Sequence, residues 1–258
     1  MTVVSDLEQD WHTWHAARER DLDTDYGWLS IVAFDWLPSA PTALQGLPGQ
    51  WWADERAHVS ASGELTLGGE PVRGTVSASV PEAGSLSWLL YGDRLAELVL
   101  RGGRYAVRQR DPGAVTRRDF TGVPAYALDD NWLVTGYFSP YPKAQRLEVT
   151  TARDDLRQHV IAVGTVHVAL GDRAYELVAT AAGDSRLNLS FHDQTNGAET
   201  APWRTVTTGP VARDGSVSID FNRAINLPFA FTAYGTCPAP VPGNRIDLPV
   251  TAGEKKVR

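Results

Sequence analysis

After about residue 55, hydrophobic and polar residues alternate along most of the chain, as in β-strands that bury one face. The clearest element is a hairpin in which Gly102-Gly103 joins Leu95–Leu100 to Tyr105–Arg110. The other predicted strands are Trp132–Phe138, Arg146–Thr151, His159–Leu170, Ala174–Thr180, Leu187–His192 and Ser216–Asn222. Short strands with regular turns predict a mainly β fold, an antiparallel β-sandwich or a barrel.

The first part of the chain has a helical pattern, over about residues 5–22. Its hydrophobic residues recur at helical intervals, and Ser5 with Glu8 three residues later has capping-box spacing. An isolated helix of this length is only marginally stable in water. We therefore predict that Trp11 and Trp14 pack against the β domain.

We predict a single domain over residues 1–258, because no stretch has the composition of a linker. It consists of a helical segment at about 5–22, a β domain at about 50–225 and a proline-rich segment at 226–258. The prolines of the last segment exclude long helices and central strands, so this segment is predicted to be mostly loop.

Composition narrows the range of partners. The net charge of −7 and the pI near 5.4, with arginines interleaved among acidic residues, argue against a nucleic-acid partner. A single cysteine, Cys237, excludes an intrachain disulfide and any zinc site that needs two thiolates. Without a signal-peptide pattern or a membrane-length apolar run, we expect a cytoplasmic protein that needs no membrane. No nucleotide motif or metal-ligand pattern is present, so we predict no cofactor and no metal.

The hairpin carries four arginines, at Arg101, Arg104, Arg108 and Arg110. Arginine suits bidentate recognition of a carboxylate or phosphate. Acidic residues nearby in the sequence nevertheless favour ordinary ion pairs, which we expect to be solvated and to contribute little to stability.

Two predicted strands each carry a polar face with a titratable group, and together they form the candidate site. In the last strand, Ser218, Asp220 and Asn222 share one face, opposite an apolar face. In Leu187–His192 the polar face ends with His192. If the two strands are sheet neighbours, this imidazole and the carboxylate of Asp220 lie within reach for general acid–base catalysis. The alternative is that both faces meet solvent.

Seven segments form a distinctive combination: Trp11–Arg18, Tyr26–Leu29, Arg101–Arg104, Arg118–Gly122, Phe191–Gly197, Asp220–Ala224 and Ala252–Lys255. Together they resemble the bacterial family known as domain of unknown function 1684, over nearly the whole chain. The resemblance implies an N-terminal helical region that leads into a mainly β domain, and it implies no established reaction. The chain departs from the family pattern at Trp203 and Phe229, whose aromatic surface suits a flat, apolar small molecule, for instance in secondary metabolism.

Three functions remain open. The first is a metal-free acid/base enzyme (a lyase, isomerase, cyclase or hydrolase) acting on a partly apolar or aromatic small molecule, with Asp220 and His192 as catalytic residues. Its substrate-binding residues would be Asn222, Arg223, Asn226, Trp203 and Phe229. The second is a module that binds a small molecule without chemistry. In the third, the motif Asp220–Arg223 is structural and holds the C-terminal segment to the sheet.

Overall fold

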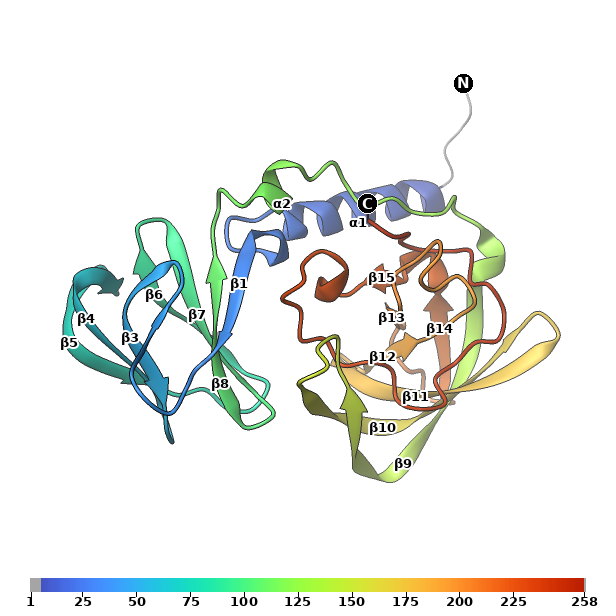
Figure 1. Cartoon of the computed structure of the whole chain (residues 1–258). Coiled ribbons are helices and arrows are strands. Elements are labelled where there is room, and N and C mark those ends of the chain that lie inside the picture. Colours follow the sequence, from blue (N-terminus) through green and yellow to red (C-terminus); the bar gives the residue numbers. More distant parts are fainter. Residues whose placement is uncertain (1–5, 258) are drawn as a thin grey trace. The chain divides into compact units, whose positions relative to one another are not determined.

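The structure is a computed structural model that describes residues 6–257 and divides into two compact units (Figure 1). The large unit comprises Met1–Ala17 and Gly122–Arg258, and the small unit comprises Arg18–Thr121. The fold is mainly β, with two antiparallel sheets and an N-terminal helix, which confirms the predicted fold class. The single domain predicted over residues 1–258 stays a prediction.

The small unit is built on one antiparallel sheet. Its elements are η1 (Trp28–Ser30), β1 (Ile31–Trp36), β2 (Thr42–Leu44), β3 (Leu47–Ala53), β4 (Ala57–Leu67), β5 (Glu70–Ala78), β6 (Ser85–Tyr91), β7 (Arg94–Arg101), β8 (Arg104–Arg110) and α2 (Val115–Arg118). The strand order is β1-β8-β7-β6-β4-β3-β2, and β5 pairs with β4. Trp51 is fully buried at the centre of its core. The first strand begins at Ile31, before the predicted start of the β domain near residue 50. The prediction missed β1 because this strand lacks the alternation of hydrophobic and polar residues that marks later strands.

The predicted hairpin is present as β7 and β8, and it buries charge. Gly102 and Gly103 both have positive φ angles, 58° and 73°, as a primed turn requires. Arg110 forms an ion pair with Glu97 at 2.8 Å, and Arg108 lies 3.8 Å from the same carboxylate. All three side chains are less than a tenth exposed. The expectation of solvated ion pairs is therefore wrong for this part of the hairpin, because both arginines turn inward to one buried carboxylate.

Helix α1 (Asp6–Leu22) confirms the predicted N-terminal helix. Its proposed capping residue, Ser5, lies outside the described residues. Trp11 is buried, and its Nε1 donates a hydrogen bond of 2.9 Å to the backbone oxygen of Asn222. A buried indole normally finds such an acceptor. The predicted packing of Trp11 against the β structure is thus confirmed within the large unit.

The strands of the large unit curve into a nearly closed, barrel-like sheet (Figure 1). Its elements are η2 (Asp130–Trp132), β9 (Leu133–Thr150), β10 (Arg157–Leu170), β11 (Arg173–Gly183), β12 (Arg186–Phe191), β13 (Arg204–Thr207), β14 (Ser216–Asp220), η3 (Phe221–Arg223), β15 (Ile225–Asn226) and η4 (Pro228–Ala230). The strand order is β14-β9-β10-β11-β12-β13-β15. Two strands predicted within residues 132–151 are one long strand, β9. Fully buried side chains such as Leu177, Leu189 and Phe191 fill the interior.

The C-terminal segment is mostly loop, as its prolines predict, and it lies against the sheet of the large unit (Figure 1, red). Asn244 holds it there. Its Nδ2 donates to the backbone oxygens of Val178, at 2.9 Å, and Ser190, at 2.8 Å. Its Oδ1 accepts from the backbone nitrogen of Val178 at 2.8 Å. One buried amide thus joins the segment to two strands, β11 and β12.

Candidate functional site

Strand β14 has the two-faced pattern that the sequence predicts, but it ends earlier than predicted. Val217 and Ile219 are buried in the core, while Ser218 between them is exposed. The strand ends at Asp220, and the chain then turns into the 3₁₀ helix η3. Asn222 therefore leaves the polar face, and its predicted alignment with Ser218 and Asp220 is wrong. The local cause is the capping of η3 by Asp220.

Both carboxylate oxygens of Asp220 are engaged by the turn that follows it. Oδ1 accepts hydrogen bonds from the backbone nitrogen and from Nδ2 of Asn222, each at 3.0 Å. Oδ2 lies 3.3 Å from Nε of Arg223. Aspartate is a favoured residue at a helix N-terminus because its side chain accepts from such backbone donors. Asp220 thus orders η3, and its side chain remains 19% exposed.

A cavity of about 370 Å³ opens beside Ser218, Asp220 and Arg223. We call it the Asp220 cavity; its other lining residues are Trp14, Arg186, Thr207, Thr208, Gly209, Pro210 and Ile225. Trp14 comes from α1, and the Cζ atom of Arg223 lies 5.4 Å from the centroid of its ring. Arg223 also forms an ion pair with Asp10 of the same helix. The polar face of β14 therefore faces a cavity with an indole wall.

Arg186 brings to this cavity a positive charge that no described residue pairs with. It is exposed, at the first position of β12. Among the described residues, no hydrogen bond or ion pair engages its side chain. The charges of Asp220 and Arg223 balance each other, so Arg186 leaves the lining with a net positive charge.

Asn222 and Asn226, both predicted to bind substrate, lie outside the lining of the Asp220 cavity. The side chain of Asn222 accepts from the backbone nitrogen of Asp129 at 3.1 Å and donates to its oxygen at 3.0 Å. Asn226 donates from its backbone to Oε2 of Glu254 at 2.6 Å and from Nδ2 to the oxygen of Lys255 at 2.8 Å. Both asparagines are buried and fasten other segments to the sheet.

His192 does not meet Asp220 across the sheet, so the condition set for an acid–base pair of these two residues is not met. Strand β12 pairs with β11 and β13, whereas β14 pairs with β9. Although β12 and β14 are close in the sequence, the long strand β9 is the strand that pairs with β14. The Nδ1 atom of His192 lies 3.0 Å from the oxygen of Pro202. Its ring lies 6.2 Å from that of Trp203, which packs on Phe229 at 4.0 Å.

The loop after His192 contains a buried ion pair that the sequence analysis missed. Asp193 forms a turn, since its Oδ1 accepts from the backbone nitrogen of Thr195 at 2.8 Å. Its Oδ2 also pairs with Nη2 of Arg204 at 3.0 Å, and neither side chain is exposed. Arg204 then donates to three backbone oxygens of the C-terminal segment, at Val250, Ala252 and Glu254. The ion pair therefore holds the C-terminal segment in place.

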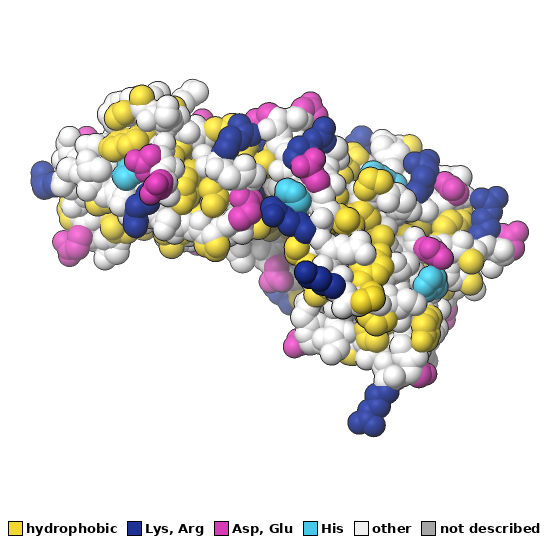
Figure 2. All heavy atoms as spheres, turned by 90° about the horizontal axis from the view of Figure 1, so that it is seen from below, with side chains coloured by type: hydrophobic (Ala, Val, Ile, Leu, Met, Phe, Trp, Pro, Cys, Tyr) yellow, Lys and Arg dark blue, Asp and Glu magenta, His cyan; other side chains and the backbone are white. Residues whose placement is uncertain are grey.

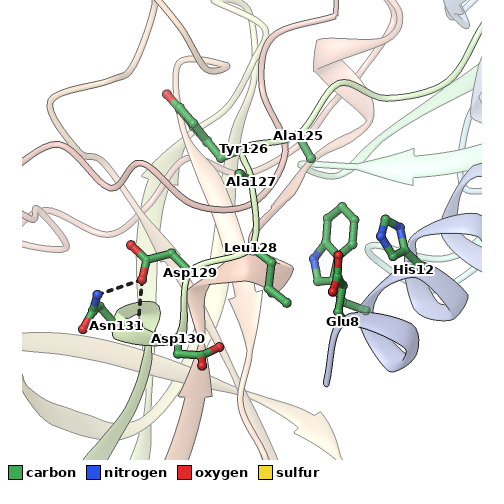
Figure 3. A pocket seen from close by; sticks show the side chains of 10 residues that line it. Glu8, His12, Ala125, Tyr126, Ala127, Leu128, Asp129, Asp130 and Asn131 are labelled. Atoms are coloured by element: carbon green, nitrogen blue, oxygen red, sulfur yellow. Dashed lines mark hydrogen bonds between the residues drawn. The ribbon is translucent and has the colours of Figure 1, made fainter. Parts of the chain in front are cut away.

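A larger cavity, of about 810 Å³, lies between α1 and residues 125–131 (Figure 3). Figure 3 shows Glu8 and His12 on the helix side, facing Leu128, while Asp129 turns away to bind Asn131. Residues 125–131 have no periodic pattern of hydrophobic and polar residues, so this cavity could not be predicted from the sequence. Its carboxylates come from Glu8, Asp129 and Asp130.

Tyr126, which also lines this larger cavity, has an altered acidity. Burial and the hydrogen bond from its hydroxyl to Glu199, 3.0 Å long, raise the pKa of Tyr126 to about 12. The described part of the chain holds no group of three or more His, Cys, Asp or Glu side chains arranged to bind a metal ion. No helix within residues 6–257 is long and apolar enough to cross a membrane.

These features define a barrel-like β protein with a small polar cavity beside its N-terminal helix. The chain belongs to the family described as "Protein of unknown function (DUF1684)", whose model matches residues 118–255. The match covers nearly the same residues as the C-terminal part of the large unit. The resemblance noted at Trp11–Arg18 and in the hairpin lies outside the matched residues and stays a prediction.

A solved structure is similar to part of the chain. It is the solution NMR structure of an uncharacterized protein from gene locus rrnAC0354 of Haloarcula marismortui. The two sequences are 25% identical, and the similarity covers 54% of this chain and 78% of that one, with a TM-score of 0.45. A similarity at this level carries no functional argument. No curated protein is significantly similar to the chain.

Proposed function

We propose that this protein binds a small molecule in the Asp220 cavity. The observation that carries the proposal is that Ser218 and Asp220 open into a cavity of about 370 Å³ walled by Trp14. If the motif held the C-terminal segment to the sheet, these side chains would face that segment. Ligand sites in proteins typically have volumes of about 300–1,000 Å³ and a few converging polar groups.

The charges of the lining favour an anionic ligand. Arg186 lacks an internal partner among the described residues, and a guanidinium suits bidentate contact with a carboxylate. The hydroxyl of Ser218 offers a further donor, and the indole of Trp14 offers an apolar wall. The ligand class is therefore a partly apolar organic acid.

Binding without chemistry fits this cavity better than acid–base catalysis does. A general base must reach the proton that it removes. Here Asn222 and Arg223 already engage both oxygens of Asp220, and His192 is on a strand that does not pair with β14. Trp203 and Phe229 contact each other outside this lining, so the proposal does not use the flat ligand predicted from them. An acid/base role for Asp220 stays a prediction.

Saturation-transfer NMR with 2-naphthoate as the probe tests the proposal. We expect transfer to the probe with the wild type and its loss with Ser218→Phe, whose ring would occupy the cavity. The matched control is Ser87→Phe, because Ser87 is also an exposed serine on a strand, β6, and lies outside the lining. No transfer with the wild type, or unchanged transfer with Ser218→Phe, would overturn the proposal.

A further inference from the structure

A second cavity, of about 360 Å³, lies beside the Asp220 cavity and is mostly apolar. We call it the apolar cleft. Its walls include Phe138, Val163, Leu187 and Val211. Leu187 belongs to the core of the large unit, and the other three pack against that core while remaining partly exposed. The cleft is thus a place where the barrel core opens to solvent. Figure 2 shows hydrophobic side chains gathered in a band over this unit.

Arg186 lines both cavities. The segment that follows β13 also borders both, since Thr208 lines the first and Val211 the second. The guanidinium of Arg186, which pairs with no described residue, therefore lies where a polar cavity meets an apolar one. This is the pattern that an anionic head with a hydrocarbon tail would complement.

The turn before Arg186 is strained. Asp184 and Ser185 have φ angles of 49° and 58°, in the left-handed region that a two-residue primed turn requires. Glycine is the usual residue at the second of these positions, and a non-glycine residue there costs about 1 kcal/mol or more. Ser185 also lines the apolar cleft.

We propose that the ligand is a single-chain amphiphilic carboxylate, whose head lies at Arg186 in the Asp220 cavity and whose tail lies in the apolar cleft. The inference rests on the proposed function, because it assigns a ligand class to the same site. Burial of the tail supplies affinity, since each buried methylene contributes about 0.8 kcal/mol, which is about fourfold in Kd. The guanidinium supplies selectivity for an acid over the corresponding alcohol.

Isothermal titration calorimetry with hexanoate, octanoate and decanoate tests the inference. For the wild type we expect Kd to fall by about fourfold per added methylene until the cleft is full. Arg186→Gln should weaken all three acids by about tenfold and leave the increment per methylene unchanged. The matched control is Arg213→Gln, because Arg213 is an exposed arginine that lines neither cavity.

The tail is tested separately by Val163→Asp, which should remove most of the chain-length dependence. Val163→Thr, nearly isosteric, should reduce it and serves if the aspartate variant does not fold. A wild type that binds the acids without any gain per methylene would overturn the amphiphile inference. If in that case 2-naphthoate binds to the wild type and not to Ser218→Phe, the proposed function is kept and only the amphiphile inference fails. If neither the fatty acids nor 2-naphthoate bind, both fail.

Discussion

The buried pair of Asp193 and Arg204 gives the sharpest prediction about stability. Neither side chain is exposed, and their closest atoms are 3.0 Å apart. Arg204 donates to the oxygens of Val250, at 2.8 Å, and Glu254, at 3.2 Å, and also to that of Ala252. One guanidinium thus neutralises a buried carboxylate and satisfies three carbonyl groups.

We expect Arg204→Met to lower the free energy of unfolding by at least about 3–5 kcal/mol, because it leaves Asp193 as a buried charge without a cation. Each carbonyl that stays dry without a donor would add about 1–3 kcal/mol. A domain's total stability is about 5–15 kcal/mol, so the loss is a large fraction of it. At about 2–4 °C per kcal/mol, the melting temperature should fall by roughly 6–20 °C.

Urea unfolding followed by tryptophan fluorescence measures this loss. Asp193→Asn and the double variant with Arg204→Met complete a mutant cycle, in which the two changes should cost clearly less together than the sum of their separate losses. The control is Arg213→Gln, an exposed arginine whose loss should change stability by no more than about 0.5 kcal/mol. If Arg204→Met lowers the free energy of unfolding by less than about 1 kcal/mol, this ion pair does not hold the C-terminal segment in place.

Three further predictions follow from single sites. Ser185→Gly should raise the free energy of unfolding by about 0.5–1 kcal/mol, because it relieves a positive φ of 58°; a decrease in a urea melt would contradict this. Ultraviolet titration of the wild type against Tyr126→Phe should show this phenol ionising near pH 12, so the stability it contributes is kept below about pH 10 and lost as the pH rises towards 12; ionisation near pH 10 would be the opposite result. Asp220→Asn keeps an acceptor for Asn222, so a thermal melt should show a loss of about 1 kcal/mol or less, whereas a loss above about 3 kcal/mol would assign Asp220 to the scaffold.

Much of the large unit could be predicted from its sequence, because alternation reports which face of a strand is buried. Val217 and Ile219 are in the core and Ser218 is exposed, as the pattern in β14 indicates. The pattern could not show where the strand ends. Asn222 continues the alternation in the sequence, but the cap at Asp220 turns the chain into η3 first.

The sequence could not predict which strands pair or which residues far apart in the chain contact each other. The sequence left open whether the strands of His192 and Asp220 are neighbours in the sheet, and the structure pairs β14 with β9 instead. Arg204 likewise binds carbonyl oxygens about fifty residues away, and no local pattern encodes that contact. Such pairings depend on the closure of the whole sheet and on what the C-terminal segment covers.

The central claim is that the Asp220 cavity binds an organic acid, and a ¹H–¹⁵N NMR titration of the wild type with decanoate tests it most directly. We predict that the largest shift changes occur at the backbone amides of Arg186, Ser218 and Asp220 and at the indole NH of Trp14, all of which saturate with one Kd. The claim is contradicted if no shift changes occur. It is also contradicted if saturable changes occur only at residues that line neither the Asp220 cavity nor the apolar cleft.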